Sequence, residues 1–389
     1  MRTVILINDN REAFKDYANS EPHFGPAPTA LLEGLALLPE AEIHVVSCVR
    51  KPVTAPKKIG PNIFYHRVVV PKLGWMRTLY LGCIMATRKK IKEIGPDIVH
   101  GQGTERDCAI SAVFSGFPNV LTIHGNMQAI AQLHGARIGS FHWLAARLET
   151  FALRRTRGVF CNSAYTEDLV SPHAPRTWRV ANALRLEFFE PLPAPQTSAV
   201  PVLLNVGVIQ PRKQQLQLLA VARRLHERGW RFELQFAGPL GGSSQESTFV
   251  QGFIRELAVA EKAGYARHIG NLSAVQLVKA MDAASALVHF PSEEAFGLVV
   301  VEALARNLKF FGAATGGIVD IAGGVELAEL IPPGDFAGLE IAVDNWLKAD
   351  RPRPRSAAPL MRKLYHPEVI ARQHLKIYQR VLHHQTPLT

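Results

Sequence analysis

Residues 286–304 read ALVHFPSEEAFGLVVVEAL, and the interpretation of the whole chain starts from this stretch. Residues 286–290 are a short apolar run, which is typical of a buried strand in a parallel sheet. A proline and a serine interrupt it, and Gly297 then opens a second apolar run that contains a single carboxylate, Glu302. The stretch therefore predicts a strand, a turn that carries Glu294, and a helix that begins near Gly297.

A helix that begins directly after a parallel strand is a suitable place for an anion. Its first N–H groups have no partners within the helix, and its dipole puts positive partial charge at the same end. Glu302 lies too far inside the helix to favour that phosphate, but it could accept hydrogen bonds from both hydroxyls of a ribose. One interpretation is a nucleotide site with phosphate at the turn. The alternative is an ordinary strand–helix unit with solvated acids, and the spacing alone favours neither.

The length and composition indicate a globular protein with two domains. The 389 residues exceed one ordinary core, and the apolar fraction of 47% and charged fraction of 20% are normal for such proteins. No apolar run approaches the roughly 20 residues that cross a bilayer. The apolar run in residues 1–9 ends in Asn and Asp, which predicts a first buried strand and not a signal peptide. We therefore expect a cytoplasmic protein.

The cysteines are few and lack metal-binding spacing. None forms a C-x-x-C pair, and each lies among apolar residues, which is typical of reduced, buried thiols. We expect neither a metal site nor a disulfide framework. The four are Cys48, Cys83, Cys108 and Cys161.

The net charge of +11 is concentrated in residues 50–92, which contain eleven Lys or Arg and no Asp or Glu. Such a segment would be attracted to an anionic membrane surface, and the interleaved Trp75, Leu79 and Tyr80 favour that interpretation. Residues 75–93 are expected to form a strongly basic helix. The alternatives are a solvated basic face or a polyanion. A nucleic acid is the least favoured partner because no nucleic-acid motif occurs. We therefore expect a peripheral protein on the inner face of the membrane as one option.

Strands and helices alternate along the chain in two series, which predicts two doubly wound α/β domains. The proline-rich residues 188–198 separate the two series and form the best linker. We therefore place the domains at 1–195 and 196–369, with the ligand cleft between them. The loop at residues 23–28 follows the first strand but lacks a G-x-G-x-x-G pattern, which disfavours a standard dinucleotide site.

With these pieces in place, the chain resembles glycosyltransferase family 4, the retaining, nucleotide-sugar-dependent enzymes of GT-B fold. The most specific match is the E-x7-E element formed by Glu294 and Glu302. The resemblance implies two Rossmann-like domains that face each other across a cleft. It also implies that Glu294 lies by the donor sugar, that Glu302 holds the ribose, and that the N–H groups after Phe296 meet the diphosphate, at Gly297, Leu298 and Val299.

A second match lies at residues 206–213, which resemble the family's G-R-x-x-x-x-K element. The resemblance implies that Gly207 borders the donor and that Lys213 contacts the diphosphate, whose charge grows as the glycosidic bond breaks. The family's arginine position holds Val208 here, and Arg212 could supply the second cation instead. The alternative is a non-catalytic or weakened nucleotide-sugar-binding protein of the same fold.

The N-terminal domain carries further matches. His124, at a strand end, resembles the family histidine that lies near the donor sugar and the acceptor. Gly25 lies where a glycine-rich loop approaches the phosphates, although its neighbour is Pro26. The family pattern also returns the last helix, residues 370–389, to this domain, which would bind the acceptor while residues 196–369 bind the donor.

The working hypothesis is retaining transfer of a sugar from a nucleoside diphosphate sugar to a glycan, lipid-linked or small-molecule acceptor. Cell-envelope or exopolysaccharide synthesis is the expected setting. The leaving phosphate would help to deprotonate the acceptor, so no protein nucleophile is required. No cofactor or metal is expected, because the cations and a helix N-terminus neutralise the diphosphate and no D-x-D triplet occurs. An epimerase or a phosphorylase of this fold is disfavoured by the E-x7-E spacing.

Overall fold

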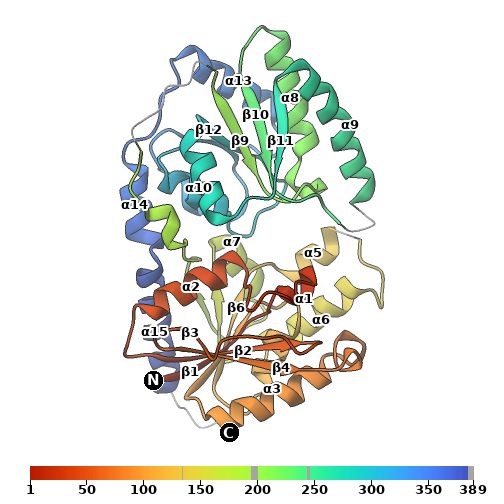
Figure 1. Cartoon of the computed structure of the whole chain (residues 1–389), viewed down its shortest axis with the longest axis vertical. Coiled ribbons are helices and arrows are strands. Elements are labelled where there is room, and N and C mark those ends of the chain that lie inside the picture. The colour runs from red at the N-terminus through yellow and green to blue at the C-terminus, as the bar shows by residue number, and fades with distance from the viewer. Residues whose placement is uncertain (134, 194–199, 243–245, 384–389) are drawn as a thin grey trace. The chain divides into compact units, whose positions relative to one another are not determined.

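The computed structural model describes residues 1–133, 135–193, 200–242 and 246–383, which belong to two compact units (Figure 1). Unit 1 comprises Met1–Arg185 together with the C-terminal segment that begins at Tyr365, and unit 2 comprises Leu186–Leu364. The sequence placed the first crossing between residues 195 and 196, which lie outside the described residues, and the second after residue 369. The structure places the two crossings after Arg185 and after Leu364.

An eight-stranded sheet forms the centre of unit 1, in the order β3-β4-β2-β1-β5-β6-β7-β8. All neighbouring strands are parallel except the pair β3 and β4. The strands are β1 (Arg2–Leu6), β2 (Glu42–Val49), β3 (Lys58–Gly60), β4 (Ile63–Val69), β5 (Ile98–Gln102), β6 (Asn119–Ile123), β7 (Val159–Cys161) and β8 (Thr177–Arg179).

Helices cover both faces of this sheet, which explains why its central strands are apolar at successive positions. In β1, Val4 and Leu6 pack with α4 and α6, whereas Ile5 packs on the opposite face with α2 and α15. The helices of unit 1 are α1 (Arg11–Phe14), α2 (Pro26–Ala36), α3 (Leu81–Ile94), α4 (Asp107–Val113), α5 (Met127–Leu133), α6 (Phe141–Leu153), α7 (Ala164–Val170) and α15 (Pro367–His383).

Unit 2 has a fully parallel six-stranded sheet in the order β11-β10-β9-β12-β13-β14. Its strands are β9 (Val202–Val206), β10 (Glu233–Ala237), β11 (Ala266–Gly270), β12 (Ala286–His289), β13 (Lys309–Ala313) and β14 (Ala328–Ile331). Its helices are α8 (Gln215–Glu227), α9 (Ser247–Ala263), α10 (Ala274–Ala283), α11 (Leu298–Ala305), α12 (Gly317–Ala322) and α13 (Phe336–Lys348), and α14 (Ala357–Tyr365) leads back to unit 1.

Each sheet reverses its winding at one point. In unit 1, β1 lies between β2 and β5, and in unit 2, β9 lies between β10 and β12. The loops that follow the two strands at such a point diverge to opposite faces of the sheet and leave a crevice at its carboxyl edge. Within unit 2 this places the loop after β9 opposite the loop after β12, which carries Glu294.

Residues 75–93 were expected to form one helix, and this expectation is wrong in its first part. Two short 3-10 turns, Lys72–Gly74 and Met76–Thr78, precede α3, which begins only at Leu81. Leu79 and Tyr80 adopt left-handed backbone conformations, with φ of 50° and 64°, and these interrupt a right-handed helix. Their sequence gave no sign of this, because neither residue is glycine or asparagine.

The expected linker is also more ordered at its start than its composition suggests. Leu186–Phe189 is a 3-10 turn in which Phe188 is fully buried. The guanidinium of Arg306 donates hydrogen bonds to the carbonyls of Glu190 (2.6 Å) and Phe188 (3.4 Å), which fixes this segment to unit 2.

Two further expectations concerned membrane-spanning helices and the state of the cysteines. Within the described ranges, no helix combines the length and apolarity needed to cross a membrane. All four cysteines are free thiols and all are buried, as their apolar sequence context predicted.

Candidate active site

Lys213 reaches the centre of the unit 2 crevice from the loop after β9. Pro211–Lys213 forms a 3-10 turn, and Gln214 follows with φ of 55° before α8 begins. The side chain of Lys213 runs back over Gly207, where a Cβ atom would lie 3.6 Å from the lysine Cε. The spacing of Gly207 and Lys213 therefore directs the ammonium group toward the loop after β12.

Glu294 meets Lys213 from that second loop. The lysine Nζ lies 2.5 Å from the carboxylate Oε2, and the Nε2 of His289, the last residue of β12, lies 3.1 Å from the same oxygen. The side chains of Lys213 and Glu294 are each 13% exposed, so this contact is shielded without being closed to a ligand. The structure thus brings together two predicted residues that are 81 positions apart, and adds His289, which the sequence analysis did not single out.

The pKa shifts of the three groups follow from this arrangement. Burial alone would raise the pKa of Glu294, but the Lys213 charge and the His289 hydrogen bond hold it well below the ordinary value. Burial lowers the pKa of Lys213, and the Glu294 carboxylate opposes that shift. Burial and the neighbouring Lys213 charge lower the pKa of His289 to about 4, so the ring is neutral at pH 7 and donates its Nε2–H to Glu294. Glu294 is therefore an ionised hydrogen-bond acceptor and not a proton donor.

Arg212 is engaged differently from Lys213. Its guanidinium donates to the backbone carbonyl of Glu293 at 2.7 Å and to the Glu293 carboxylate at 3.3 Å. Val208 stands at the position where the family motif has an arginine. It is 38% exposed, and its carbonyl accepts a hydrogen bond from Gln215. In this structure, then, Lys213 points at Glu294 while the charge of Arg212 is directed to Glu293.

Helix α11 begins beside Glu294. Gly297 precedes it with φ of 98°, and a Cβ atom there would lie 3.5 Å from the Glu294 Cγ. The backbone N–H groups at Gly297, Leu298 and Val299 belong to the loop and the first turn, so they form the start of α11 that was predicted to hold a phosphate. Phe296 is buried at 4% exposed, and Glu302, one turn into the helix, is 5% exposed.

The next loop fixes the position of Glu294 from behind. Gly316 adopts φ of 51°, and a Cβ atom there would lie 1.8 Å from the carbonyl oxygen of Glu294. The N–H of Gly317 donates to that same carbonyl at 3.0 Å. Only a residue without a side chain fits at Gly316, which explains why a glycine stands at this position after β13.

In unit 1, His124 follows β6 and is oriented by a chain of hydrogen bonds. Its Nε2 lies 3.0 Å from the Gln102 Oε1, which can only accept, so Nε2 carries the proton and Nδ1 is the acceptor of the ring. Gln102 contacts His100, whose Nδ1 lies 2.5 Å from the hydroxyl of Tyr378 in α15. Burial lowers the pKa of His124, opposed by Glu105. Through these hydrogen bonds, the C-terminal helix α15 orients His124, a predicted site residue of unit 1.

Gly25 is placed less favourably for a phosphate. It precedes α2 with φ of −64°, and a Cβ atom there would meet only Pro28 at 3.7 Å. Neither the backbone conformation nor the space therefore requires glycine. Pro26 and Pro28, the first and third residues of α2, have no N–H to donate, so this helix start offers few hydrogen bonds to an anion.

Two features of unit 1 were missed by the sequence analysis. Asp9 and Arg11 form a buried ion pair in the loop after β1, with the Arg11 Nη2 at 2.6 Å from the Asp9 Oδ2 and the hydroxyl of Tyr65 donating to the same oxygen. Glu149, in α6, is 1% exposed and accepts hydrogen bonds from the Thr104 hydroxyl and the Met127 N–H. Burial raises the pKa of Glu149 to about 7. The only signal available was the short spacing of Asp9 and Arg11.

Family models match both parts of the chain. A family model described as Glycosyltransferase Family 4 matches residues 31–182, and one described as Glycosyl transferases group 1 matches residues 190–359. The 2-deoxystreptamine N-acetyl-D-glucosaminyltransferase of Streptomyces fradiae is 27% identical over 310 residues, which cover 74% of this chain and 70% of that protein.

Solved structures agree on the fold. Sucrose-phosphate synthase from Thermosynechococcus elongatus matches with a TM-score of 0.74 at 19% identity, covering 98% of this chain and 100% of that one. The Anabaena protein HepE, solved with UDP and glucose, matches with a TM-score of 0.70 at 14% identity, covering 97% and 99%. Two parallel α/β units of this kind define the GT-B class of glycosyltransferases.

The chain belongs to glycosyltransferase family 4, as the matches to the two family models show. It is a nucleotide-sugar-dependent glycosyltransferase. The predictions of family, GT-B fold and enzyme class are thereby confirmed.

Proposed function

We propose that the chain transfers a hexose from a UDP-sugar to a hydroxyl of a small, polar acceptor, with retention of the anomeric configuration. The observation that carries the proposal is the contact of Lys213 with Glu294 beside the start of α11. A cation, a sugar-binding carboxylate and unpaired helical N–H groups are the three parts that a nucleoside diphosphate sugar needs. UDP is the first choice of nucleotide because the structurally similar HepE was solved with UDP and glucose.

In the donor complex, the diphosphate would lie at Gly297, Leu298 and Val299 with Lys213 beside it. The ammonium group has three N–H donors and uses one on Glu294, so it can also bind a phosphate oxygen. As the glycosidic bond breaks, the leaving phosphate gains charge, and a cation already held in place stabilises that charge without reorganisation. Glu302 would accept hydrogen bonds from the ribose.

Glu294 would hold the sugar by accepting hydrogen bonds from its hydroxyls. Its low pKa keeps it ionised, and Lys213 and His289 occupy one of its oxygens, so it is a poor nucleophile. Retention would then proceed by attack of the acceptor from the face that the phosphate leaves, with the phosphate taking the acceptor proton. This route needs neither a covalent enzyme intermediate nor a metal ion.

The acceptor would bind to unit 1, at the edge where His124 and Glu105 lie. Gly125, next to His124, donates its N–H to the Glu105 carboxylate at 3.2 Å. A carboxylate beside a neutral histidine suits an acceptor that carries both amines and hydroxyls. The Streptomyces fradiae relative is named for transfer to 2-deoxystreptamine, a molecule with both groups. A glycan or lipid-linked acceptor of the cell envelope is the alternative.

The test is a donor and acceptor screen that detects release of the nucleoside diphosphate. The protein would be incubated with UDP-, GDP- and ADP-sugars, with aminocyclitols or short glycans as acceptors, with and without a chelator. We expect activity with a UDP-sugar, unchanged by the chelator, and NMR should show the donor's anomeric configuration in the product. An inverted product would overturn the retaining mechanism, and loss of activity with the chelator would overturn metal independence.

We also propose that the basic segment 50–92 binds an anionic membrane surface. Of its eleven basic side chains, all but Lys90 are exposed, and Leu73 and Met85 beside them are 67% and 65% exposed. Trp75 and Tyr80, which first suggested the membrane, are instead buried at 4% and 3%. Sedimentation with anionic vesicles should show binding at low salt and release at high salt. Binding that does not respond to salt, or no binding, would contradict the proposal.

A further inference from the structure

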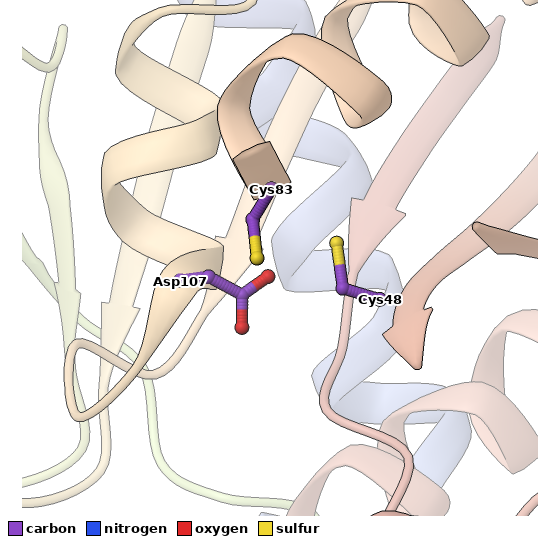
Figure 2. A group of neighbouring side chains, drawn as sticks. All are labelled: Cys48, Cys83 and Asp107. Carbon is purple, nitrogen blue, oxygen red and sulfur yellow. The ribbon is translucent and has the colours of Figure 1, made fainter. Parts of the chain in front are cut away.

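Three polar side chains of unit 1 meet in an otherwise apolar place. They are Cys48 of β2, Cys83 of α3 and Asp107, the first residue of α4 (Figure 2). Figure 2 shows the two sulfur atoms and the carboxylate directed toward one another from these three elements. The two Sγ atoms and a carboxylate oxygen all lie within 4.8 Å of one another. Trp75, Tyr80 and Val70 belong to the surrounding apolar cluster.

The group is deeply buried and incompletely satisfied. Cys48, Cys83 and Asp107 are 6%, 0% and 3% exposed, and the Asp107 Oδ1 is buried without a hydrogen-bond partner among the described residues. A carboxylate in such a place is costly unless a cation or a donor compensates it. Two thiols are weak donors and do not provide that compensation. The arrangement is therefore unfavourable as a purely structural core.

We propose that Cys48, Cys83 and Asp107 form a binding site for a thiophilic divalent cation such as Zn²⁺. Two thiolates and one carboxylate are a donor set that zinc accepts, with the fourth tetrahedral position open to a water molecule. Zinc–sulfur bonds of about 2.3 Å and a zinc–oxygen bond of about 2.0 Å require ligand atoms roughly 3.5–3.8 Å apart. Contraction of the group by about 1 Å meets this requirement.

Binding would exchange protons for the metal ion. Hydrogen bonding with Cys83 and burial raise the pKa of Cys48, and burial raises the pKa of Asp107. Two thiolates and one carboxylate around a divalent ion would carry one negative charge in total, and the thiol protons would pass to the solvent. Affinity should therefore increase with pH.

The neighbouring charges suit that product. Arg106 precedes Asp107, and its charge lowers the pKa of that carboxyl. Tyr80 and Cys108 are the neighbouring groups, and burial raises the pKa of both, so these two remain neutral. The Arg106 guanidinium also lies 5.6 Å from the Trp75 ring centroid. A buried complex of charge −1 therefore has a cation beside it.

The ion would join β2 and α4 to α3, and most of α3 belongs to the basic segment 50–92. Trp75 also belongs to this segment and is part of the apolar cluster around the three ligands. The spacing of the ligands explains why the sequence analysis expected no metal site. The three come from separate elements, and no two are close enough in the chain to form a recognisable metal-binding pair.

The test is titration of the full chain, reduced and freed of metal, with Cd²⁺ and then Zn²⁺ alone. Thiolate ligands give an ultraviolet charge-transfer band with Cd²⁺, which the histidines of the chain do not produce. We expect a band that saturates at one equivalent and a release of protons as the thiols bind the ion. Equilibrium dialysis should find one Zn²⁺ per chain.

The variants identify the ligands. Cys48→Ser and Cys83→Ser should each weaken Cd²⁺ binding by at least about tenfold and reduce the band, and Asp107→Asn should weaken binding but keep the band. Cys161→Ser is the matched control, since Cys161 is equally buried in unit 1 but outside the group, and it should bind as the wild type does. If a cysteine variant fails to fold, the Cd²⁺ band of the wild type and weaker binding in Asp107→Asn still decide the question.

Two results would overturn the proposal. The first is the absence of a band at one equivalent in the reduced protein, or a band that persists unchanged in Cys48→Ser and Cys83→Ser. The second is a Cys48–Cys83 cross-link found by mass spectrometry in air-exposed protein whose reduced form binds no metal, which would make the group a redox pair. Neither result depends on sugar transfer, so the test is independent of the proposed function.

Discussion

The two sheets share a topology, but the crevices at their carboxyl edges differ in chemistry. In unit 2, Lys213 and Glu294 face each other across the crevice and remain partly exposed. In unit 1, Asp9 and Arg11 both follow β1, and their ion pair is closed off, with side chains 0% and 1% exposed. A switch point places two loops opposite each other, but it does not decide whether their charges are available to a ligand.

The helix starts differ in the same direction. Helix α11 begins after Gly297 with backbone N–H groups at its first positions, whereas α2 has Pro26 and Pro28 in its first turn. Unit 2 therefore offers positive charge and backbone donors to an anion. Unit 1 offers a neutral histidine, His124, and the Glu105 carboxylate. The comparison teaches that similar topologies can present a cation with backbone donors in one unit and a neutral histidine with a carboxylate in the other.

The largest effect should come from breaking the closed ion pair of unit 1. Asp9→Asn leaves the Arg11 guanidinium buried without its carboxylate, and we expect a loss of about 3–5 kcal/mol in the free energy of unfolding. Chemical denaturation followed by circular dichroism measures it. Tyr65→Phe is the control, because it removes one hydrogen bond to Asp9 and should cost about 1 kcal/mol. Equal costs in the two variants would show that the ion pair is not what stabilises this loop.

The open ion pair of unit 2 should matter for activity instead. Lys213→Ala removes the cation from the proposed diphosphate site, and we expect kcat to fall by about 10²–10³-fold. Arg212→Ala is the matched control, since that guanidinium is bound to Glu293 in this structure. Steady-state transfer assays with both variants separate the two cations. A loss with Arg212→Ala as large as with Lys213→Ala would mean that Arg212 turns toward the donor when it binds.

A pH effect should distinguish the buried acid of unit 1 from Glu294. The pKa of Glu149 is raised by burial to about 7, so the folded state binds more protons than the unfolded state above the ordinary range of a glutamate. Stability should therefore be fully present below pH 4.5 and decline as pH rises to 7, by about 3 kcal/mol for this group. Glu149→Gln should remove the decline. An identical pH profile for wild type and variant would contradict the assignment.

The support behind Glu294 can be tested with two glycines. Gly316→Ala places a Cβ atom 1.8 Å from the Glu294 carbonyl, which forces that loop to move. We expect about 1–3 kcal/mol of destabilisation and weaker donor binding by calorimetry. Gly324→Ala is the matched control, because its φ of 80° is similar but nothing lies within 4 Å of the new atom. Equal losses of donor affinity would show that the left-handed backbone, and not the contact with Glu294, is responsible.

The smallest effect should come from restoring a cation in the loop after β9. Val208 is 38% exposed, so an arginine fits there without disturbing the core. If this position faces the diphosphate, Val208→Arg should raise kcat/KM by up to about tenfold through an added charge at the leaving group. Val208→Met, which is similar in length but neutral, is the control. The same kcat/KM in both variants would mean that the position does not reach the donor.

Much of the fold could be predicted from sequence because it depends on local pattern. The alternation of apolar strands and helices gave two parallel α/β domains, and the order of the elements followed. Leu79 and Tyr80 show the limit, since their left-handed conformations depend on tertiary packing and delay the start of the helix predicted at 75–93 until Leu81. Trp75 and Tyr80 suggested an exposed amphipathic face, yet both are buried, because a helical pattern does not apply to a segment of 3-10 turns.

The candidate site divides in the same way. Glu294 and Lys213 could both be assigned to the donor site in advance, because a family motif covers each of them, but their direct contact was not predicted. The orientation of Arg212 toward Glu293 could not, since two adjacent cations are equivalent in sequence and only side-chain geometry separates them. The cluster of Cys48, Cys83 and Asp107 was unpredictable for another reason, because each ligand comes from a different element.

Helix α15 has a consequence for the order in which the chain can fold during synthesis. Tyr378 in this helix holds the hydrogen-bonded chain that leads to His124, and Gly34 of α2 lies so close to Pro367 that a Cβ atom would be 2.1 Å from its carbonyl oxygen. Unit 1 therefore cannot close its core on the ribosome until α15 has emerged, whereas unit 2, which is encoded without interruption, can. The domain that begins first should finish last, and its apolar α2 face would remain exposed in the meantime.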